Sequence, residues 1–460
     1  MLRSILLLFV YISFLGLGAS APFILALGYV WVDTFRPQEV AYIILNQLPV
    51  AMIMGAAAMG AYLVFDRKDP PKLTLAGATP AILAVWSTVA MAWSVAGDFA
   101  WVKWDWAFKV LMFAAFLPYV IRSRVQIEAM AQVYLCALAG NIIPFGVKTI
   151  ISGGGYGQNL GLGGGNSGLG EGGQLSTFCL MAVPIAYYLS RNAQLIPRNF
   201  VTSMAYKGIL VLSAVTAIGT FQRSALVGAG VLGIYMFMRS RQKVLFGSIL
   251  GIATAVLLYT ASGSYMNRMN TIGTYQADSS AMVRVMVWKW TLAYVASHPL
   301  GGGFNSYIIN VIELPGDGEN PPEVQHGRAF HSSYFEVLGE LGIPGFALFI
   351  VTIATTILSL RRLAKRTRNV PHLAWCAELS DALQSGIMVF MASGAFVGIA
   401  FQPILWYFLA LTVSLREYVR RVNALSAKTV DTSWRGRGKA PSPASTPAGA
   451  LPSGPGWRQR

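Results

Sequence analysis

Charged residues are scarce in this chain of 460 residues. Asp, Glu, Lys and Arg together make up 12% of the sequence, about half the share found in an ordinary soluble domain. Apolar residues make up 55%, and the mean hydropathy is +0.53. This composition excludes a water-soluble enzyme, a disordered protein and a receptor with one span and a large soluble head. It predicts a membrane protein with many spans.

Cysteine and histidine are also rare, with three and four copies. Cys136, Cys179 and Cys376 lie in or beside apolar segments, and an odd count without a CxxC pair excludes a disulfide framework and a zinc site. The Gly-rich stretch at 151–173 lacks a Gly-Lys-Ser/Thr ending, which excludes a P-loop. No DxD motif occurs either, so we expect neither a metal nor another cofactor.

Long apolar runs fill most of the chain, and they are continuous rather than alternating, which argues against a β-barrel. A membrane-crossing helix needs about 20 apolar residues, so the runs predict an all-α fold with about twelve transmembrane helices. The runs are 4–31, 42–65, 74–96, 106–121, 126–150, 174–190, 205–221, 225–238, 244–262, 334–358, 382–400 and 404–418. The first run contains Gly16, Gly18 and Pro22, so it forms either one broken helix or a tight hairpin.

The net charge of +16 comes mainly from short basic clusters between the apolar runs. Loops with such clusters stay in the cytoplasm. If both termini are cytoplasmic, every cluster falls on that side, in loops 66–72, 122–124, 191–204, 239–243 and 359–381. The positive charge therefore indicates a membrane orientation, and we expect no nucleic-acid partner.

Three segments are not membrane spans. The Gly-rich stretch at 151–173 and the much longer loop at 263–333 fall on the outside, and the loop contains a predicted amphipathic helix at 280–297. The end of the chain, 427–460, is rich in Pro, Ser, Gly and Arg, which predicts a disordered cytoplasmic tail. The chain thus divides into a membrane domain at 1–426 and a tail, and a loop as long as 263–333 usually carries function.

A few basic residues break the cytoplasmic pattern. Arg223, Arg284 and Arg328 lie in outside segments, and Lys148 lies toward the outside end of its span. Simple membrane-surface packing explains an isolated arginine of this kind. Guanidinium groups also suit the binding of phosphate, because they stay charged and can bind two oxygens at once.

Two histidines precede the tenth apolar run. His326 and His331 lie at its outside edge, and Glu336 and Glu340 follow one helical turn apart. Acidic groups within a membrane are costly unless they are functional or paired. A histidine at such an edge is a plausible general base, because its ordinary pKa of about 6.5 lies close to neutral pH.

Several motifs together resemble the O-antigen ligase and polymerase family. They are the stretch from His331 to Gly345, Arg284 followed by Trp288 and then Pro299–Phe304, and Arg223-Ser224-Ala225, where Gln222 replaces the serine usual in the family. Three further matches resemble one branch, the O-glycosylation ligases associated with exosortase systems: Phe35-Arg36-Pro37, Gly146-Val147-Lys148 and Gly394-Ala395-Phe396. The resemblance covers roughly residues 1–420. Gly170–Gln174 departs from it, because that branch has an Asp-Asn-Asn-like run there.

The resemblance implies an enzyme of the bacterial inner membrane that acts at the periplasmic face. It would transfer a glycan from undecaprenyl diphosphate to a lipid, glycan or protein acceptor, without a metal and with inversion at the anomeric carbon. Arg223 and Arg284 would hold the diphosphate, and His331 would act as the base or position the acceptor. The further candidates for substrate binding are Lys148, Arg328, His326 and Glu340.

Other functions remain open at this level. A polysaccharide polymerase uses the same carrier and differs only in its acceptor. A flippase or transporter of lipid-linked glycans belongs to another class; the absence of an internal repeat counts against it, and Lys109 is the residue that fits it best. A scaffold protein is a third alternative. The donor sugar, the acceptor and the oligomeric state are not determined by the sequence.

Overall fold

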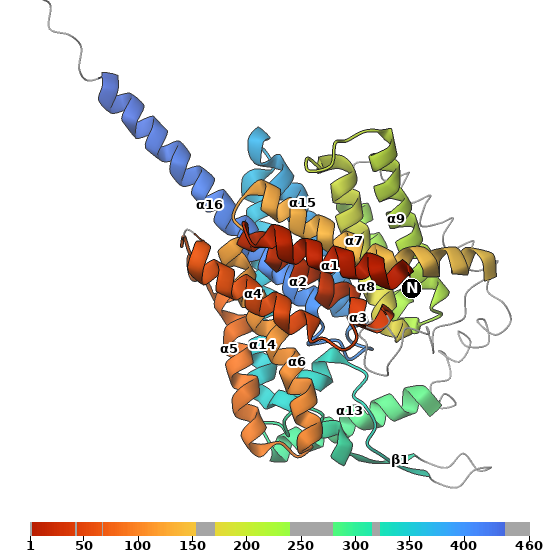
Figure 1. Ribbon diagram of the computed structural model, residues 1–460. Helices are drawn as coiled ribbons and strands as arrows, with labels where there is room; N and C mark the ends of the chain where they lie inside the picture. Colours follow the sequence, from red (N-terminus) through yellow and green to blue (C-terminus); the bar gives the residue numbers. More distant parts are fainter. Residues whose placement is uncertain are drawn as a thin grey trace, which may run out of the picture. The chain divides into compact units, whose positions relative to one another are not determined.

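The computed structural model describes residues 2–41, 44–66, 68–152, 171–239, 279–314 and 323–437. Within these ranges the chain forms fourteen α-helices and one small two-stranded sheet, so the prediction of an α-helical fold is confirmed (Figure 1). The chain divides into two compact units, 1–418 and 419–460. The candidate site lies entirely in the first unit.

The helices are α1 (Leu2–Gly18), α2 (Pro22–Phe35), α3 (Pro37–Val40), α4 (Val50–Phe65), α5 (Leu75–Val89), α6 (Asp98–Val120), α7 (Arg124–Ser152), α8 (Gly172–Asn192), α9 (Phe200–Gly219), α10 (Arg223–Arg239), α13 (Ser279–Ser297), α14 (Ser333–Thr367), α15 (Ala374–Ser393) and α16 (Pro403–Arg437). Short 3-10 turns are η1 (Ala90–Trp93), η2 (Ser306–Ile309) and η3 (Pro371–Leu373). Strands β1 (Val311–Leu314) and β2 (Glu323–His326) pair antiparallel.

Four of the described helical segments are long and apolar enough to cross a membrane: Leu75–Trp93, Arg124–Ile151, Phe200–Gly219 and Ser333–Thr367. Three other apolar helices, α1, α2 and α4, are shorter. Large apolar side chains such as Phe9, Phe65 and Phe200 are exposed, as lipid-facing residues are. These features agree with a multi-pass membrane protein, while the expected number of twelve spans stays a prediction. The run at 244–262 lies outside the described residues.

The first apolar run forms a hairpin rather than one broken helix. α1 ends at Gly18, and α2 begins at Pro22, with three residues between them. The Phe14 ring stacks on Trp31, with ring centroids 5.8 Å apart. The Arg3 guanidinium donates to the carbonyl of Val40 at 2.6 Å. The run therefore folds into two helices that pack on each other, while the number of times it crosses a membrane stays a prediction.

The loop that follows α13 packs against α14 at a kink near the start of that helix. Gly342 has a φ of +65° within this helix. A Cβ atom at this glycine would lie 2.3 Å from the carbonyl oxygen of Pro299, so only glycine fits. The amide of Ile343 donates to that carbonyl at 2.9 Å, and the amide of Gly303 donates to Glu340 O at 2.9 Å. These contacts fix the end of α13 against α14.

The basic loops that were expected in the cytoplasm meet at one end of the first unit. Arg122 pairs with Asp66 at 3.1 Å, which links the end of α6 to the end of α4. Arg239 of α10 and Arg368 after α14 both bind Asp381 of α15. These loops are far apart in sequence, so their meeting fits the expected orientation without establishing it.

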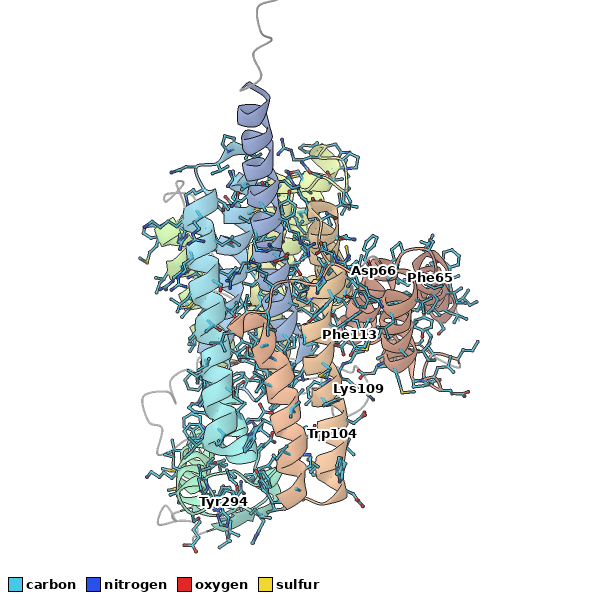
Figure 2. The ribbon with its side chains drawn as sticks, turned by 90° about the vertical axis from the view of Figure 1, so that its left-hand side faces the viewer. Phe65, Asp66, Trp104, Lys109, Phe113 and Tyr294 are labelled. Carbon is cyan, nitrogen blue, oxygen red and sulfur yellow. The ribbon has the colours of Figure 1, made fainter. Side chains whose placement is uncertain are left out.

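The opposite end of α14 holds the candidate site. The part of this helix after the kink, residues 343–367, is about 37 Å long at 1.5 Å per residue. Figure 2 shows α13, marked by Tyr294, close to where α14 begins. The expected tail boundary at 427 falls within α16, which continues as a helix to Arg437; residues 438–460 lie outside the described part of the chain.

Candidate functional site

His331 lies in the last turn of the chain before α14, in a conformation that is unusual for a residue other than glycine. Its φ is +48°, in the left-handed region, where histidine is enriched relative to most side chains. The backbone is held on both sides of it. The indole of Trp288 donates to Phe330 O at 2.9 Å, and the amide of Ser333 donates to Gly394 O at 2.7 Å. The imidazole is therefore presented from a fixed backbone.

The loop between α15 and α16, residues 394–402, wraps around the first turn of α14. The Ser333 hydroxyl donates to Val397 O at 2.8 Å and accepts from the amide of Ile399 at 3.0 Å. The amide of Ala400 donates to a carboxylate oxygen of Glu336 at 3.1 Å. These bonds satisfy polar groups at a helix start that is almost completely buried. They also bring the resembling Gly394-Ala395-Phe396 motif beside His331.

α13 confirms the helix expected at 280–297 and places Arg284 above the same helix start. Trp288, one turn after Arg284, stacks on Phe335 of α14 with ring centroids 5.1 Å apart and an interplanar angle of 4°. Val287 is buried in a cluster with Phe330. α13 is thus packed on protein along this face, which membrane-surface packing alone does not explain.

Arg284 lies close enough to two titratable groups to shift their pKa values. Burial lowers the pKa of His331 below 6.5, and the positive charges of Arg284 and Arg328 lower it further. Desolvation raises the pKa of Glu171, while a hydrogen bond from Gln174 and the charge of Arg284 oppose that rise. Residues from three distant segments therefore share one electrostatic environment, in which the imidazole is neutral at pH 7.

A row of polar side chains leads from Glu171 to the start of α16. The amide group of Gln174 donates to the Glu171 carboxylate at 3.0 Å, and Gln402 donates to Gln174 Oε1 at 3.0 Å. Both residues belong to the stretch Gly170–Gln174 that departs from the resembling branch, and Glu171 directly precedes α8. Residues 153–170 of the Gly-rich stretch lie outside the described residues.

Arg223 begins α10, immediately beside the start of α8. The residue before the turn, Phe221, has a φ of +52°. The Ser393 hydroxyl donates to Ser224 O at 3.1 Å, and a Cβ atom on Gly173 would meet Val397 at 3.0 Å. Arg223 therefore lies at the same end of the helices as Glu171 and the 394–402 loop.

The remaining candidates occupy more peripheral positions. Asn310 holds the backbone of Arg328 from both sides, accepting from its amide at 2.9 Å and donating to its carbonyl at 2.6 Å. His326 is exposed in β2, opposite Val311. Lys148 is exposed near the end of α7, where the neighbouring Thr149 lies against α9. Arg328 thus belongs to the surroundings of His331, and His326 and Lys148 lie farther out.

Glu340 belongs to a cluster of three charged residues, with Lys103 and Glu336, that was not predicted from the sequence. The ammonium group of Lys103, on α6, lies 2.6 Å from Glu336 and 2.7 Å from Glu340. Glu340 is completely buried and also accepts from the amide of Asn305 at 2.9 Å. The sequence-based search had singled out Lys109 instead, which forms an exposed pair with Asp105. Glu340 therefore braces α14 against α6, next to the site.

Removing this lysine should destabilise the protein. Lys103→Met leaves two buried carboxylates without their counter-ion, which costs about 3–5 kcal/mol. Lys109→Met is the matched control, because its exposed pair, one helical turn apart, contributes only about 0.3–0.5 kcal/mol. Thermal unfolding of the detergent-purified chain, followed by tryptophan fluorescence, should show a large loss of stability for the first variant only. Equal midpoints for the two variants would contradict the bracing role.

Comparison with protein families gives two matches. The O-Antigen ligase family matches residues 208–350, a range that contains Arg223, Arg284, His331 and Glu340. A family of unknown function (DUF5935) matches residues 2–194. No curated protein matches the chain. The part of the chain at 208–350 is therefore similar to the O-antigen ligase family.

Proposed function

We propose that this protein transfers a glycan from undecaprenyl diphosphate to an acceptor hydroxyl at the periplasmic face of the bacterial inner membrane. The observation that carries the proposal is that His331 directly precedes a long apolar helix, where the indole of Trp288, one turn after Arg284, holds the neighbouring Phe330 carbonyl at 2.9 Å. His331 and Arg284 both lie within the matched O-antigen ligase domain. The position at a helix start suits a donor whose lipid tail must remain in the bilayer.

Arginine side chains serve the leaving group. As the bond between the anomeric carbon and the phosphate oxygen breaks, negative charge grows on the diphosphate. Arg284 and Arg223 would stabilise that charge through paired N–H donors, which strengthen in a partly dry site. Arg328 adds a third positive charge near His331. The energy for transfer comes from the activated donor, so no nucleotide is consumed.

His331 serves the attacking group. The acceptor hydroxyl forms the new bond to the anomeric carbon and gives its proton to the neutral imidazole, while the lipid diphosphate departs. A histidine kept unprotonated by burial and by nearby cations can take that proton at neutral pH. Attack opposite the leaving group inverts the anomeric centre. This scheme requires no metal ion.

We place the protein, by the motifs near residues 35, 146 and 394, in the branch of O-glycosylation ligases associated with exosortase systems. In this assignment the transferred group is an oligo- or polysaccharide, and the acceptor is a protein, a lipid or a glycan. A polymerase would use a second lipid-linked unit as acceptor with the same site. A transporter is disfavoured, because the buried charges of Lys103, Glu336 and Glu340 are paired with one another near one end of α14.

The decisive experiment is a transfer assay with the purified full chain. A defined undecaprenyl diphosphate-linked glycan is supplied with a protein, a lipid or a second lipid-linked unit, and the products are separated by mass. Transfer to the protein or lipid acceptor supports ligation, transfer to the lipid-linked unit supports polymerisation, and no transfer to any acceptor contradicts the proposal. Activity that survives EDTA supports metal independence, while a loss restored by a divalent cation refutes it.

The pH profile of transfer should report the lowered pKa of His331. The base acts only when neutral, so kcat/KM should fall as the pH drops through a midpoint below 6.5. Arg284→Gln removes one of the charges that depress this pKa, so its midpoint should move up toward 6.5. In the complex with the donor, the negative diphosphate offsets those positive charges and raises the pKa of His331. As the pH is lowered, kcat should therefore begin to fall at a higher pH than kcat/KM. A midpoint that does not move in Arg284→Gln would contradict the coupling.

A further inference from the structure

A polar cavity lies at the other end of the first unit, among the basic loops. It has a volume of about 480 Å³ and is formed where α8 ends and α9 begins, beside the start of α15. Its lining is Ser190, Arg191, Asn192, Arg198, Asn199, Phe200, Ser203 and Glu378. The reaction proposed above uses none of these residues.

The two arginines give the cavity a positive charge. Arg198 donates through Nη1 to the carbonyl of Arg191 at 2.7 Å, which holds the two residues together. Arg191 donates through Nη1 to the hydroxyl of Tyr187 at 3.2 Å. Its distance to Glu378 is 3.9 Å, too long for a hydrogen bond. Both of these hydrogen bonds use Nη1, so within the described part of the chain the Nε and Nη2 donors of Arg191 and Arg198 can bind an anion.

The single acidic residue of the cavity does not cancel this charge. Glu378 accepts a hydrogen bond of 2.8 Å from the Asn192 amide, which turns one carboxylate oxygen toward α8. Two arginines against one glutamate leave a net charge of +1 on the lining. The Ser190 hydroxyl donates to the carbonyl of Tyr187 at 2.7 Å, so the hydroxyl of Ser203 is the one that adds a donor of the kind that binds phosphate oxygens.

The rim of the cavity is apolar. Phe200, which is part of the lining, is 77% exposed, and its neighbour Val201 is 71% exposed. Leu195 and Ile196 in the preceding loop are also exposed. α9 is itself one of the helices able to cross a membrane, so these side chains lie where such a helix enters the bilayer. A soluble anion would gain nothing from this rim, whereas acyl chains would cover it.

We propose that this cavity binds the headgroup of an anionic phospholipid, with the phosphate on Arg191 and Arg198 and the acyl chains along the start of α9. Basic pockets between membrane helices on the cytoplasmic side bind anionic lipids by this combination of contacts. The bound lipid would anchor the α8–α9 connection in the leaflet on the side away from His331. This site is independent of the transfer reaction.

Lipid binding is measured by native mass spectrometry of the purified full chain, titrated with phosphatidylglycerol or with phosphatidylcholine. The wild type should bind phosphatidylglycerol more tightly. A basic residue near an anionic lipid contributes a factor of about five to the affinity. Arg191→Gln or Arg198→Gln should therefore weaken this binding about fivefold, and the double variant should weaken it about thirtyfold. The control is Arg361→Gln with Arg362→Gln, exposed arginines at the carboxyl-terminal end of α14 and outside the cavity; this pair should bind as the wild type does.

Three outcomes would overturn the proposal: equal affinity for the two lipids, an equal loss in the control pair, or unchanged binding in the double variant. Displacement of the lipid by millimolar inorganic phosphate alone would show a soluble-anion site and would also overturn it. If the double variant does not fold, Arg198→Gln decides, because this side chain is exposed and its loss removes only one hydrogen bond to the protein.

Discussion

Replacing His331 should abolish transfer while leaving the protein folded and inserted. Loss of a general base typically lowers kcat about 10²- to 10⁴-fold, and no other described histidine lies at the start of α14. His331→Ala alone is ambiguous, because the residue has a φ of +48° and alanine tolerates that conformation poorly. His331→Asn removes the difficulty, since asparagine readily adopts the left-handed region but cannot accept the proton.

The two variants are compared with His372→Ala in the transfer assay. His372 is an exposed histidine in η3, at the other end of α14, so its replacement should leave the rate unchanged. Unfolding midpoints of all three variants are measured in parallel. We expect His331→Asn to be as stable as the wild type. Its activity should be as low as that of His331→Ala. A His331→Asn enzyme that retains wild-type kcat would eliminate the general-base role.

Arg284→Lys should slow transfer strongly, although less than Arg284→Gln does. Lysine keeps the positive charge but cannot offer two parallel N–H donors to phosphate oxygens. The loss of one charge-assisted hydrogen bond should lower kcat roughly 10- to 100-fold, and loss of the whole group about 10²- to 10³-fold. Because the charge on the diphosphate grows as the bond breaks, the effect should fall on kcat more than on KM.

Lys289→Gln provides the control for Arg284. It lies on the same helix, is exposed, and loses one positive charge. If the net charge of α13 mattered rather than the fork of Arg284, Lys289→Gln would reduce the rate and Arg284→Lys would not. The opposite result, a normal Lys289→Gln and a slow Arg284→Lys, supports direct binding of the diphosphate.

Local features of the sequence predicted the elements of this fold well. Apolar runs gave the helices, and a periodic pattern gave α13 within two residues of its observed start. The candidates Arg284 and His331 were singled out because each is an ionisable residue among mostly apolar neighbours, and their roles stay predictions. Each of these predictions depends on about twenty neighbouring residues, so it can be made from local composition and spacing alone.

Several contacts at the site could not be predicted in this way. Lys103 was overlooked although it neutralises Glu336 and Glu340, because its partners are 233 and 237 residues away. The 394–402 loop reaches Ser333, two residues after His331, from more than 60 residues away along the chain. Nothing in the local sequence around Lys103 distinguishes it from Lys109, whose partner is one turn away. Only the packing of α6 on α14 separates the buried cation from the exposed one.

The sequence by itself therefore determined that this chain is helical, rich in apolar helices, and poor in charge except at a few exposed sites. The tertiary structure decided that the first run folds back as a hairpin, and which of the charges meet. The physical reason is that burial of apolar side chains depends on local composition, whereas an ion pair depends on two groups that the fold must bring within 4 Å. Such pairing joins Glu336 and Glu340 to Lys103, and the same packing places the charge of Arg284 where it lowers the pKa of His331.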